Sequence, residues 1–384
     1  MDYRKIGRDQ VATSLFGMGC MRLPLEVQPD GSKQYGKIDE DEAIRMIRYA
    51  IDHGVTYLDT AYPYHQGNSE RVVGKALTGG YRDKVLLATK MPVWQVKKAA
   101  DFERLLNEQL EKLQTTWIDF YLLHALNEDS WKKVKQLGVL DFLEKARQAG
   151  KIRHIAFSFH DQLPVFKEII DSFAWDMCQI QLNLLDEHYQ AGLEGMHYAA
   201  DRGISIVVME PLRGGALAQK VPQDIKAVWE QAPVKRSPAE WAFRYLTDYP
   251  QVSVILSGVT TMEQLVDNIR SFADAKPDSL TEQEKDLIGQ VQTLYRDKIK
   301  VGCTGCNYCM PCPSGVSIPD VFRIYNQAFL YEDLEASRKQ YQSLISKQHD
   351  ASQCVSCGQC EPQCPQNIPI IAKLAEAHAF LSRT

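Results

Sequence analysis

Short apolar runs alternate with longer amphipathic stretches over about the first 275 residues of the chain. The runs are brief and rich in β-branched and aromatic residues, which is typical of buried parallel strands. Between them, apolar residues recur at helical spacing, as Ile44, Ile47 and Ile51 do within residues 41–52. The pattern predicts strands at residues 14–18, 55–58, 85–88, 118–123, 155–157, 178–182, 204–209 and 252–256.

Eight strands, most of them followed by a helical pattern, favour an α/β fold in which a parallel sheet closes into a (β/α)8 barrel. The predicted helices include residues 102–113 and 134–147. An open doubly wound sheet is the alternative. Such sheets usually carry a G-x-G-x-x-G fingerprint after the first strand, and this sequence has none.

The barrel pattern breaks at residues 276–279, where Lys-Pro-Asp-Ser reads as a loop. A helix is predicted over residues 282–300, and two more over 318–330 and 334–345. We therefore expect three parts: a barrel over residues 1–275, a connecting segment and helix over 276–300, and a small α-helical domain over 301–384.

The composition narrows the class of protein. The 384 residues are 45% hydrophobic and 24% charged, which excludes a disordered or fibrous chain. The net charge of -5 argues against a nucleic-acid partner. No apolar run reaches the roughly 18 residues of a membrane span, and the first residues lack the apolar core of a signal peptide. We expect a cytoplasmic protein without a membrane span.

Ten cysteines stand out against this ordinary composition. Cys20 and Cys178 are isolated, whereas the other eight follow residue 302 in two groups of four. Clustered thiols in a reducing compartment favour metal binding over disulfides. The groups are Cys303, Cys306, Cys309 and Cys312, then Cys354, Cys357, Cys360 and Cys364.

The spacing of these cysteines favours iron–sulfur clusters. The second group, with Pro365 after it, matches the ferredoxin run C-x2-C-x2-C-x3-C-P, and the first is one residue shorter before its fourth cysteine. In two-cluster ferredoxins the fourth cysteine of each run ligates the other cluster. We expect two 4Fe–4S clusters, one on Cys303, Cys306, Cys309 and Cys364, and one on Cys354, Cys357, Cys360 and Cys312. Because helical segments separate the two groups, the module looks like an α-helical ferredoxin. A pair of structural zinc sites is the alternative.

Three polar residues stand where predicted strands end: Asp59, Lys90 and His124. Tyr64 follows Asp59 by five residues. In a barrel, the carboxyl ends of the strands and the loops after them build the active site. Taken singly, each residue has an ordinary interpretation as a helix cap, a surface charge, a satisfied histidine or a rim aromatic.

Taken together, the order and surroundings of these four residues resemble the aldo-keto reductase family. Residues 54–64, 87–90 and 119–124 carry the resemblance, and Ser69-Glu70 completes it. It implies that Tyr64 is the general acid for carbonyl reduction. Lys90, held by Asp59, would lower the pKa of Tyr64 from its usual value near ~10. His124 would orient the substrate carbonyl.

The resemblance also implies a nicotinamide cofactor, NADP or NAD. Ser158 and Gln179 match residues that hold the nicotinamide amide, but Phe159 stands where the family has asparagine. Glu210 could disfavour a nearby phosphate or contact the substrate. The nucleotide-site residues implied are Ser158, Gln179, Met209, Pro211, Leu212, Ser257, Gly258 and Asn268.

The expected function is reversible carbonyl–alcohol oxidoreduction of a small-molecule substrate. One alternative is a reductase that receives electrons through its clusters from ferredoxin or another carrier. Another is an electron-transfer or redox-sensing protein whose barrel only binds nucleotide. The sequence has no flavin motif that we recognise.

Overall fold

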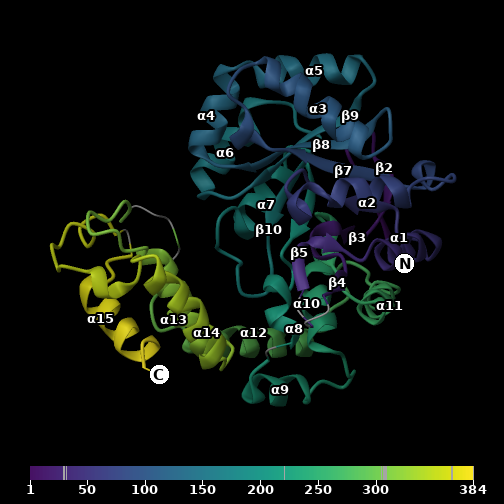
Figure 1. The fold of residues 1–384 in the computed structure, drawn as a ribbon. Coiled ribbons are helices and arrows are strands. Elements are labelled where there is room, and N and C mark those ends of the chain that lie inside the picture. Colours follow the sequence, from purple (N-terminus) through teal and green to yellow (C-terminus); the bar gives the residue numbers. More distant parts are fainter. Residues whose placement is uncertain are drawn as a thin grey trace. The chain divides into compact units, whose positions relative to one another are not determined.

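The structure is a computed structural model that describes residues 1–28, 31, 33–219, 221–303, 305, 309–364 and 366–383. The chain divides into two units, which do not follow one another simply along the sequence (Figure 1). The first comprises residues 1–212 and 240–280, and the second comprises residues 213–239 and 281–384. The segment 213–239, which interrupts the first unit, therefore belongs with the C-terminal part of the chain.

The first unit is a closed barrel of eight parallel strands, as predicted. Apolar residues on the inward faces fill it, among them Tyr57, Phe120, Met177 and Val207. Because both faces of each strand are covered, the strands appear in the sequence as nearly continuous apolar runs. In barrel order the strands are β3 (Phe16–Gly19), β6 (Tyr57–Asp59), β7 (Leu86–Met91), β8 (Ile118–Leu126), β9 (Ile152–Phe159), β10 (Met177–Gln181), β11 (Ser205–Met209) and β12 (Val252–Gly258).

Helices cover the outside of the barrel (Figure 1). The predicted helix over residues 134–147 is wrong as a single element. Gly138 adopts a left-handed conformation (φ 80°) that separates α4 (Glu128–Gln136) from α5 (Val139–Gln148). The other helices of this layer are α1 (Glu40–Asp52), α2 (Ser69–Ala76), α3 (Ala100–Lys112), α6 (Leu163–Ser172), α7 (Gly192–Ala200), α10 (Pro238–Thr247) and α11 (Met262–Ser271).

Two small antiparallel hairpins are additions that the hydrophobic pattern did not predict. One pairs β1 (Tyr3–Ile6) with β2 (Val11–Ser14). The other pairs β4 (Leu25–Val27) with β5 (Lys33–Ile38) and lies between barrel strand β3 and helix α1. Most residues of β4 and β5 are at least partly exposed, so they lack the apolar runs of the barrel strands.

The second unit is helical, with a core that includes Val321, Phe322, Tyr341 and Leu374. The predicted C-terminal helices are confirmed, although the helix expected over 282–300 ends at Asp297. Within the described residues, no helix meets the length and hydrophobicity that crossing a membrane requires. The helices are α8 (Ala216–Gln219), α9 (Gln223–Trp229), α12 (Glu282–Asp297), α13 (Ile318–Leu330), α14 (Leu334–Ser346) and α15 (Ile370–Leu381).

Candidate active site and cysteine cavity

The structure brings three of the four predicted catalytic residues into one hydrogen-bonded group at the carboxyl ends of the strands. Asp59 is the last residue of β6, and Lys90 lies near the end of the neighbouring strand β7. Tyr64 opens a short 3-10 turn, Tyr64–Gly67, after β6. Lys90 Nζ donates to Asp59 Oδ1 at 2.6 Å and to Tyr64 Oη at 3.3 Å.

Lys90 is wholly buried and Asp59 is 2% exposed, so neither charge is stabilised by bulk water. Lys90 Nζ donates a third hydrogen bond to the carbonyl oxygen of Thr60 at 2.9 Å. Burial alone would lower the pKa of Lys90, but Asp59 and Tyr64 together raise it above its usual value. Burial raises the pKa of Asp59, and Lys90 opposes that change. The short contact between the two groups favours an ion pair.

The expectation that Lys90 gives Tyr64 a lowered pKa is wrong for the structure as it stands. Lys90 does lower the pKa of Tyr64, but burial of the phenol is the larger effect and raises it. Tyr64 is therefore fully protonated near neutral pH. It has a proton to donate, and Lys90 stabilises the phenolate that donation would leave.

His124 lies on β8 beside Tyr64, with a ring centroid 6.0 Å from that of Tyr64 and 5.1 Å from that of Trp94. Burial lowers the pKa of His124 well below its usual value, and Lys90 and His160 lower it further. The ring is therefore neutral at pH 7. Its Nδ1 atom is buried and has no hydrogen-bond partner among the described residues.

A break in the strand pairing accompanies His124. The register between β8 and β9 shifts between Leu123 and Leu126, and Ala125 has a left-handed backbone (φ 53°). The Ala125 amide donates to Ser158 Oγ at 2.7 Å. Ser158, predicted as a nicotinamide contact, therefore also supports the backbone beside His124. Its hydroxyl proton stays available for a second partner.

Other predicted nucleotide contacts lie near the ends of β10 and β11. Gln179 Nε2 is 3.6 Å from Met209 Sδ, a weak contact, and Gln179 Oε1 is buried without a partner among the described residues. Such an acceptor suits the amide NH2 of a nicotinamide. Phe159 is wholly buried against Phe166, at a ring distance of 5.1 Å, so it provides no polar group in place of the family's asparagine.

The end of β12 gathers a second set of predicted contacts. Asn268 Nδ2 donates to Ser257 Oγ at 3.0 Å, and Gly258 follows Ser257 at the exposed end of the strand. Sequence reasoning missed Arg22. Its side chain lies beside Gly258, because a Cβ added to Gly258 would be 3.2 Å from the Arg22 Cβ. Arg22 follows β3 in the sequence. Its basic side chain lies close to the backbone of Gly258, which a phosphate could approach.

The remaining predicted contacts, Pro211 and Leu212, follow β11. Between them and the strand, Glu210 is exposed and adopts a left-handed backbone (φ 57°). The Glu210 carbonyl oxygen accepts from Asn183 Nδ2 at 3.1 Å. This bond stabilises a conformation that is uncommon for glutamate.

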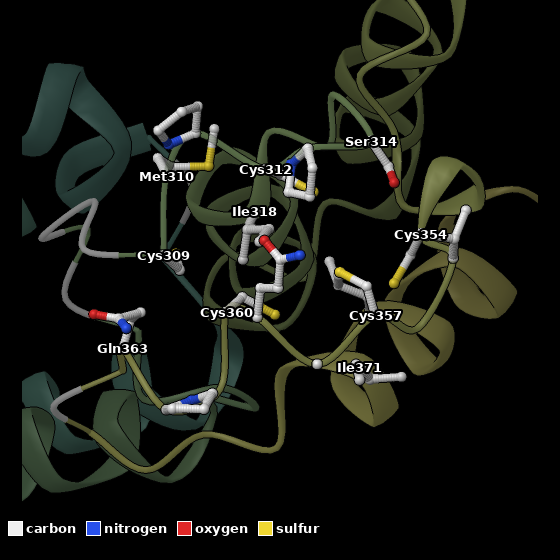
Figure 2. A pocket seen from close by; sticks show the side chains of 17 residues that line it. Cys309, Met310, Cys312, Ser314, Ile318, Cys354, Cys357, Cys360, Gln363 and Ile371 are labelled. Atoms are coloured by element: carbon white, nitrogen blue, oxygen red, sulfur yellow. The ribbon is translucent and has the colours of Figure 1, made fainter.

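The second unit contains a cavity of about 580 Å³ whose lining includes five cysteines (Figure 2). Cys312 of the first group lines it together with Cys354, Cys357 and Cys360 of the second. Burial raises the pKa of Cys360, with smaller contributions from Cys354 and Cys312. The structure thus brings together the four thiols that we expected on one cluster.

The other predicted ligands are less well gathered. Cys309 also lines the cavity, whereas Cys303 and Cys364 pack against the same apolar core without lining it. Cys306 lies outside the described residues. Among the described residues, no three His, Cys, Asp or Glu side chains converge closely enough to hold a single metal ion. A cavity bordered by spaced thiols suits a cubane, whose irons each bind one cysteine.

Hydrogen bonds hold the loops around this cavity. The Ser317 amide donates to the His349 carbonyl oxygen at 2.9 Å, which joins the segments that follow Cys312 and precede Cys354. Asn326 of α13 accepts from the Lys300 and Val301 amides and donates to the Val301 carbonyl oxygen at 2.7 Å. These bonds anchor the chain just before Cys303.

Two family models match the chain. The model of the aldo/keto reductase family matches residues 17–287, and that of a 4Fe-4S dicluster domain matches residues 302–369.

Curated relatives and solved structures agree with the first match. The uncharacterized oxidoreductase YqkF of Bacillus subtilis is 28% identical over 317 residues, covering 74% of this chain and 94% of that protein. The aldo-keto reductase YhdN of B. subtilis is 30% identical over 234 residues, covering 58% and 66%. The structure of aldo-keto reductase AKR11C1 from Bacillus halodurans aligns with a TM-score of 0.63 and 27% identity, over 76% of this chain and 96% of that one.

Proposed function

The chain belongs to the aldo/keto reductase family and carries a 4Fe-4S dicluster domain after its barrel, and from this we propose that it is a nicotinamide-linked carbonyl reductase with Tyr64 as proton donor. The family membership makes it an oxidoreductase. The observation that carries the proposal is the buried group of Tyr64, Lys90 and Asp59, because buried titratable groups with shifted pKa values that contact one another concentrate at functional sites.

We assign each side chain a role in moving one proton. Tyr64 Oη donates its proton to the oxygen of the substrate carbonyl, and Lys90, 3.3 Å away, stabilises the resulting phenolate. Asp59 keeps Lys90 charged and in place. Neutral His124, whose ring lies beside that of Tyr64, orients the carbonyl oxygen.

The barrel residues fit a nicotinamide nucleotide. Gln179 Oε1 and the Ser158 hydroxyl would hold the nicotinamide amide, and Arg22 beside Gly258 would hold a phosphate. The bound nucleotide would supply the hydride. An aldo-keto reductase from Klebsiella pneumoniae, solved in complex with NADPH, aligns with a TM-score of 0.61 at 22% identity, over 76% of this chain and 96% of that one. We propose NADP as the first nucleotide to test, with NAD as the alternative.

The second unit fits an iron–sulfur cluster through its four gathered thiols. Cys312, Cys354, Cys357 and Cys360 would hold one cluster, which would supply single-electron transfer. We propose a second cluster on Cys303, Cys306, Cys309 and Cys364. A reductase that receives electrons from a carrier such as ferredoxin is the second candidate. It is favoured by the exposure of Cys357 and of Val355, which is 69% exposed at the rim of the cavity.

Two measurements on the anaerobically reconstituted protein test these proposals. The first compares wild type with Tyr64→Phe for NADPH-dependent reduction of simple aldehydes, beginning with 4-nitrobenzaldehyde. We expect a loss of about 10²–10⁴-fold with unchanged cluster absorbance. Full activity in Tyr64→Phe would contradict the role of Tyr64.

The second measurement follows cluster absorbance near ~400 nm, typical of such clusters. NADPH, NADH and then a low-potential reductant are added in turn. Bleaching by a nicotinamide nucleotide supports electron exchange between barrel and clusters, either directly or through a flavin. Bleaching only by the low-potential reductant, together with weak nucleotide binding, favours the carrier-fed enzyme.

A further inference from the structure

The two residues that follow Tyr64 have an uncommon backbone. His65 (φ 50°, ψ 43°) and Gln66 (φ 57°, ψ 32°) both adopt the left-handed conformation, although neither is glycine. Such conformations persist where surrounding contacts over-determine them, and they concentrate at functional sites. The contacts that hold these two residues therefore bear on the position of Tyr64.

Both ring nitrogens of His65 make such contacts. Its side chain is buried, with Nδ1 2.8 Å from the Tyr35 carbonyl oxygen and Nε2 3.2 Å from the amide nitrogen of Leu23. Both nitrogens are satisfied only if Nδ1 carries the proton and Nε2 accepts from Leu23. The ring also stacks on the Tyr35 ring at 4.7 Å. Because Leu23 precedes β4 and Tyr35 belongs to β5, His65 binds the hairpin on both sides.

Two further contacts join the same hairpin to the same turn. Asn68 Nδ2 donates to the Gly36 carbonyl oxygen at 3.0 Å. The Gln66 side chain lies directly over Gly36, where an added Cβ would overlap its amide. All five contacts run between residues 23–36 and residues 65–68.

Tyr35 of the hairpin also affects the pKa of Tyr64. It raises that pKa, but its effect is smaller than those of burial, Lys90 and Asp59. The Tyr35 side chain is 44% exposed.

We propose that His65 is a positioning residue, which holds the β4–β5 hairpin against the Tyr64–Gly67 turn and thereby orients the Tyr64 phenol for proton transfer. The inference rests on the proposed function, because it takes Tyr64 as the proton donor. His65 itself transfers no proton, since both ring nitrogens are engaged by backbone groups.

The test compares His65→Ala and His65→Asn in the full reconstituted chain with a matched control. His53→Asn removes a similar set of contacts elsewhere, because His53 Nδ1 is 2.8 Å from the Tyr49 carbonyl oxygen and its ring stacks on Tyr49 at 3.8 Å. His53 lies at the exposed end of α1, outside the contacts described above. His65→Asn retains a donor for Tyr35 and serves if His65→Ala does not fold.

For 4-nitrobenzaldehyde and NADPH, we expect His65→Ala to lower kcat about 10- to 100-fold, since a small displacement of a catalytic group has effects of this size. KM for NADPH should change less than kcat does, because His65 is not itself among the proposed nucleotide contacts. His65→Asn should lie between wild type and His65→Ala, and His53→Asn should match wild type. An unchanged kcat in His65→Ala would overturn the inference.

Hydrogen exchange provides a readout that does not depend on activity. We expect faster exchange at the Leu23 amide and across residues 64–68 in His65→Ala, with no change there in His53→Asn. Unchanged exchange would overturn the inference whatever the activity. If Tyr64→Phe keeps full activity, it is the proposed function that fails, whereas the exchange data still decide whether His65 holds the turn.

Discussion

The barrel site and the cysteine cavity differ in how much of each is complete without a bound group. Lys90 and Asp59 are almost wholly buried and pair at 2.6 Å through Asp59 Oδ1, while Asp59 Oδ2 has no hydrogen-bond partner among the described residues. The cysteines of the cavity are all at least partly exposed, and Cys357 is the most exposed of them. The barrel presents a pre-organised charge pair, whereas the cavity presents ligands on loops outside regular helices and strands.

The two sites obtain their stability from different parts of the structure. Strands position the barrel residues, because the packed interior fixes β6, β7 and β8 and their ends follow. Loops position the thiols through a few hydrogen bonds, such as those of Asn326 and Ser317. A site built on loops, such as the cysteine cavity, gains much of its order from the group that it binds. Substitutions in the barrel should therefore act through charge, and those in the cavity through loss of a ligand.

The largest expected effect is that of Lys90→Met, which leaves Asp59 buried without its partner. We expect the barrel to lose about 3–5 kcal/mol of unfolding free energy. We expect activity to fall about 10²–10⁴-fold. Urea unfolding followed by tryptophan fluorescence measures the first effect, because five of the six tryptophans belong to the barrel unit.

The double variant Asp59→Asn with Lys90→Met sharpens this test. It removes the unpaired charge, so most of the stability should return while the activity stays low. If Lys90→Met alone were as stable as wild type, Lys90 and Asp59 would not form the buried ion pair that distinguishes the barrel from the cavity.

Cys312→Ser tests the cysteine cavity. If Cys312 ligates the cluster of the second cysteine group, iron content should fall from about eight to about four per chain. Barrel stability should not change, because the loss is confined to the second unit. Ser314→Ala, which changes another residue lining the same cavity, is the matched control and should keep its iron. Full iron content in Cys312→Ser would contradict the ligand set.

Much of the fold could be predicted because its signals are local. The barrel strands are covered on both faces and appear as apolar runs, and the cysteine groups have ligand spacing within a few residues. The β4–β5 hairpin lacked such a signal because it is largely exposed. The break at Gly138 was missed because isolated glycines also occur inside helices.

The candidate site was less predictable where it depends on contacts between distant segments. The position of the His65 ring depends on its contacts with Leu23 and Tyr35. These residues are far from His65 in the sequence, and only folding brings them to its ring. The same holds for Arg22 beside Gly258. The pKa of Tyr64 was predicted with the wrong sign, because the sequence shows the neighbouring lysine but not the depth of burial.

The smallest expected effect concerns the pH dependence of stability. It shows whether water is excluded from the barrel site, as the buried charges indicate. Burial lowers the pKa of His124 well below its usual value of about 6.5. Below pH 6.5 the unfolded chain therefore binds a proton that the folded barrel does not, and stability falls as the pH falls toward the lowered pKa. The stability that neutral His124 contributes is fully present above pH ~6.5. As the pH falls below this value, the unfolding free energy decreases by at most about 1.4 kcal/mol per pH unit.

His124→Gln isolates this contribution, because glutamine does not titrate. Urea unfolding of both proteins from pH 7.5 to 5.5 should show a steeper loss of stability in wild type than in His124→Gln. Since burial also lowers the pKa of His65, some pH dependence should persist in the variant. Identical slopes would mean that His124 keeps its usual pKa. The histidine side of the barrel mouth would then be open to water, as the cysteine cavity is, and the contrast between the two sites would be confined to Lys90 and Asp59.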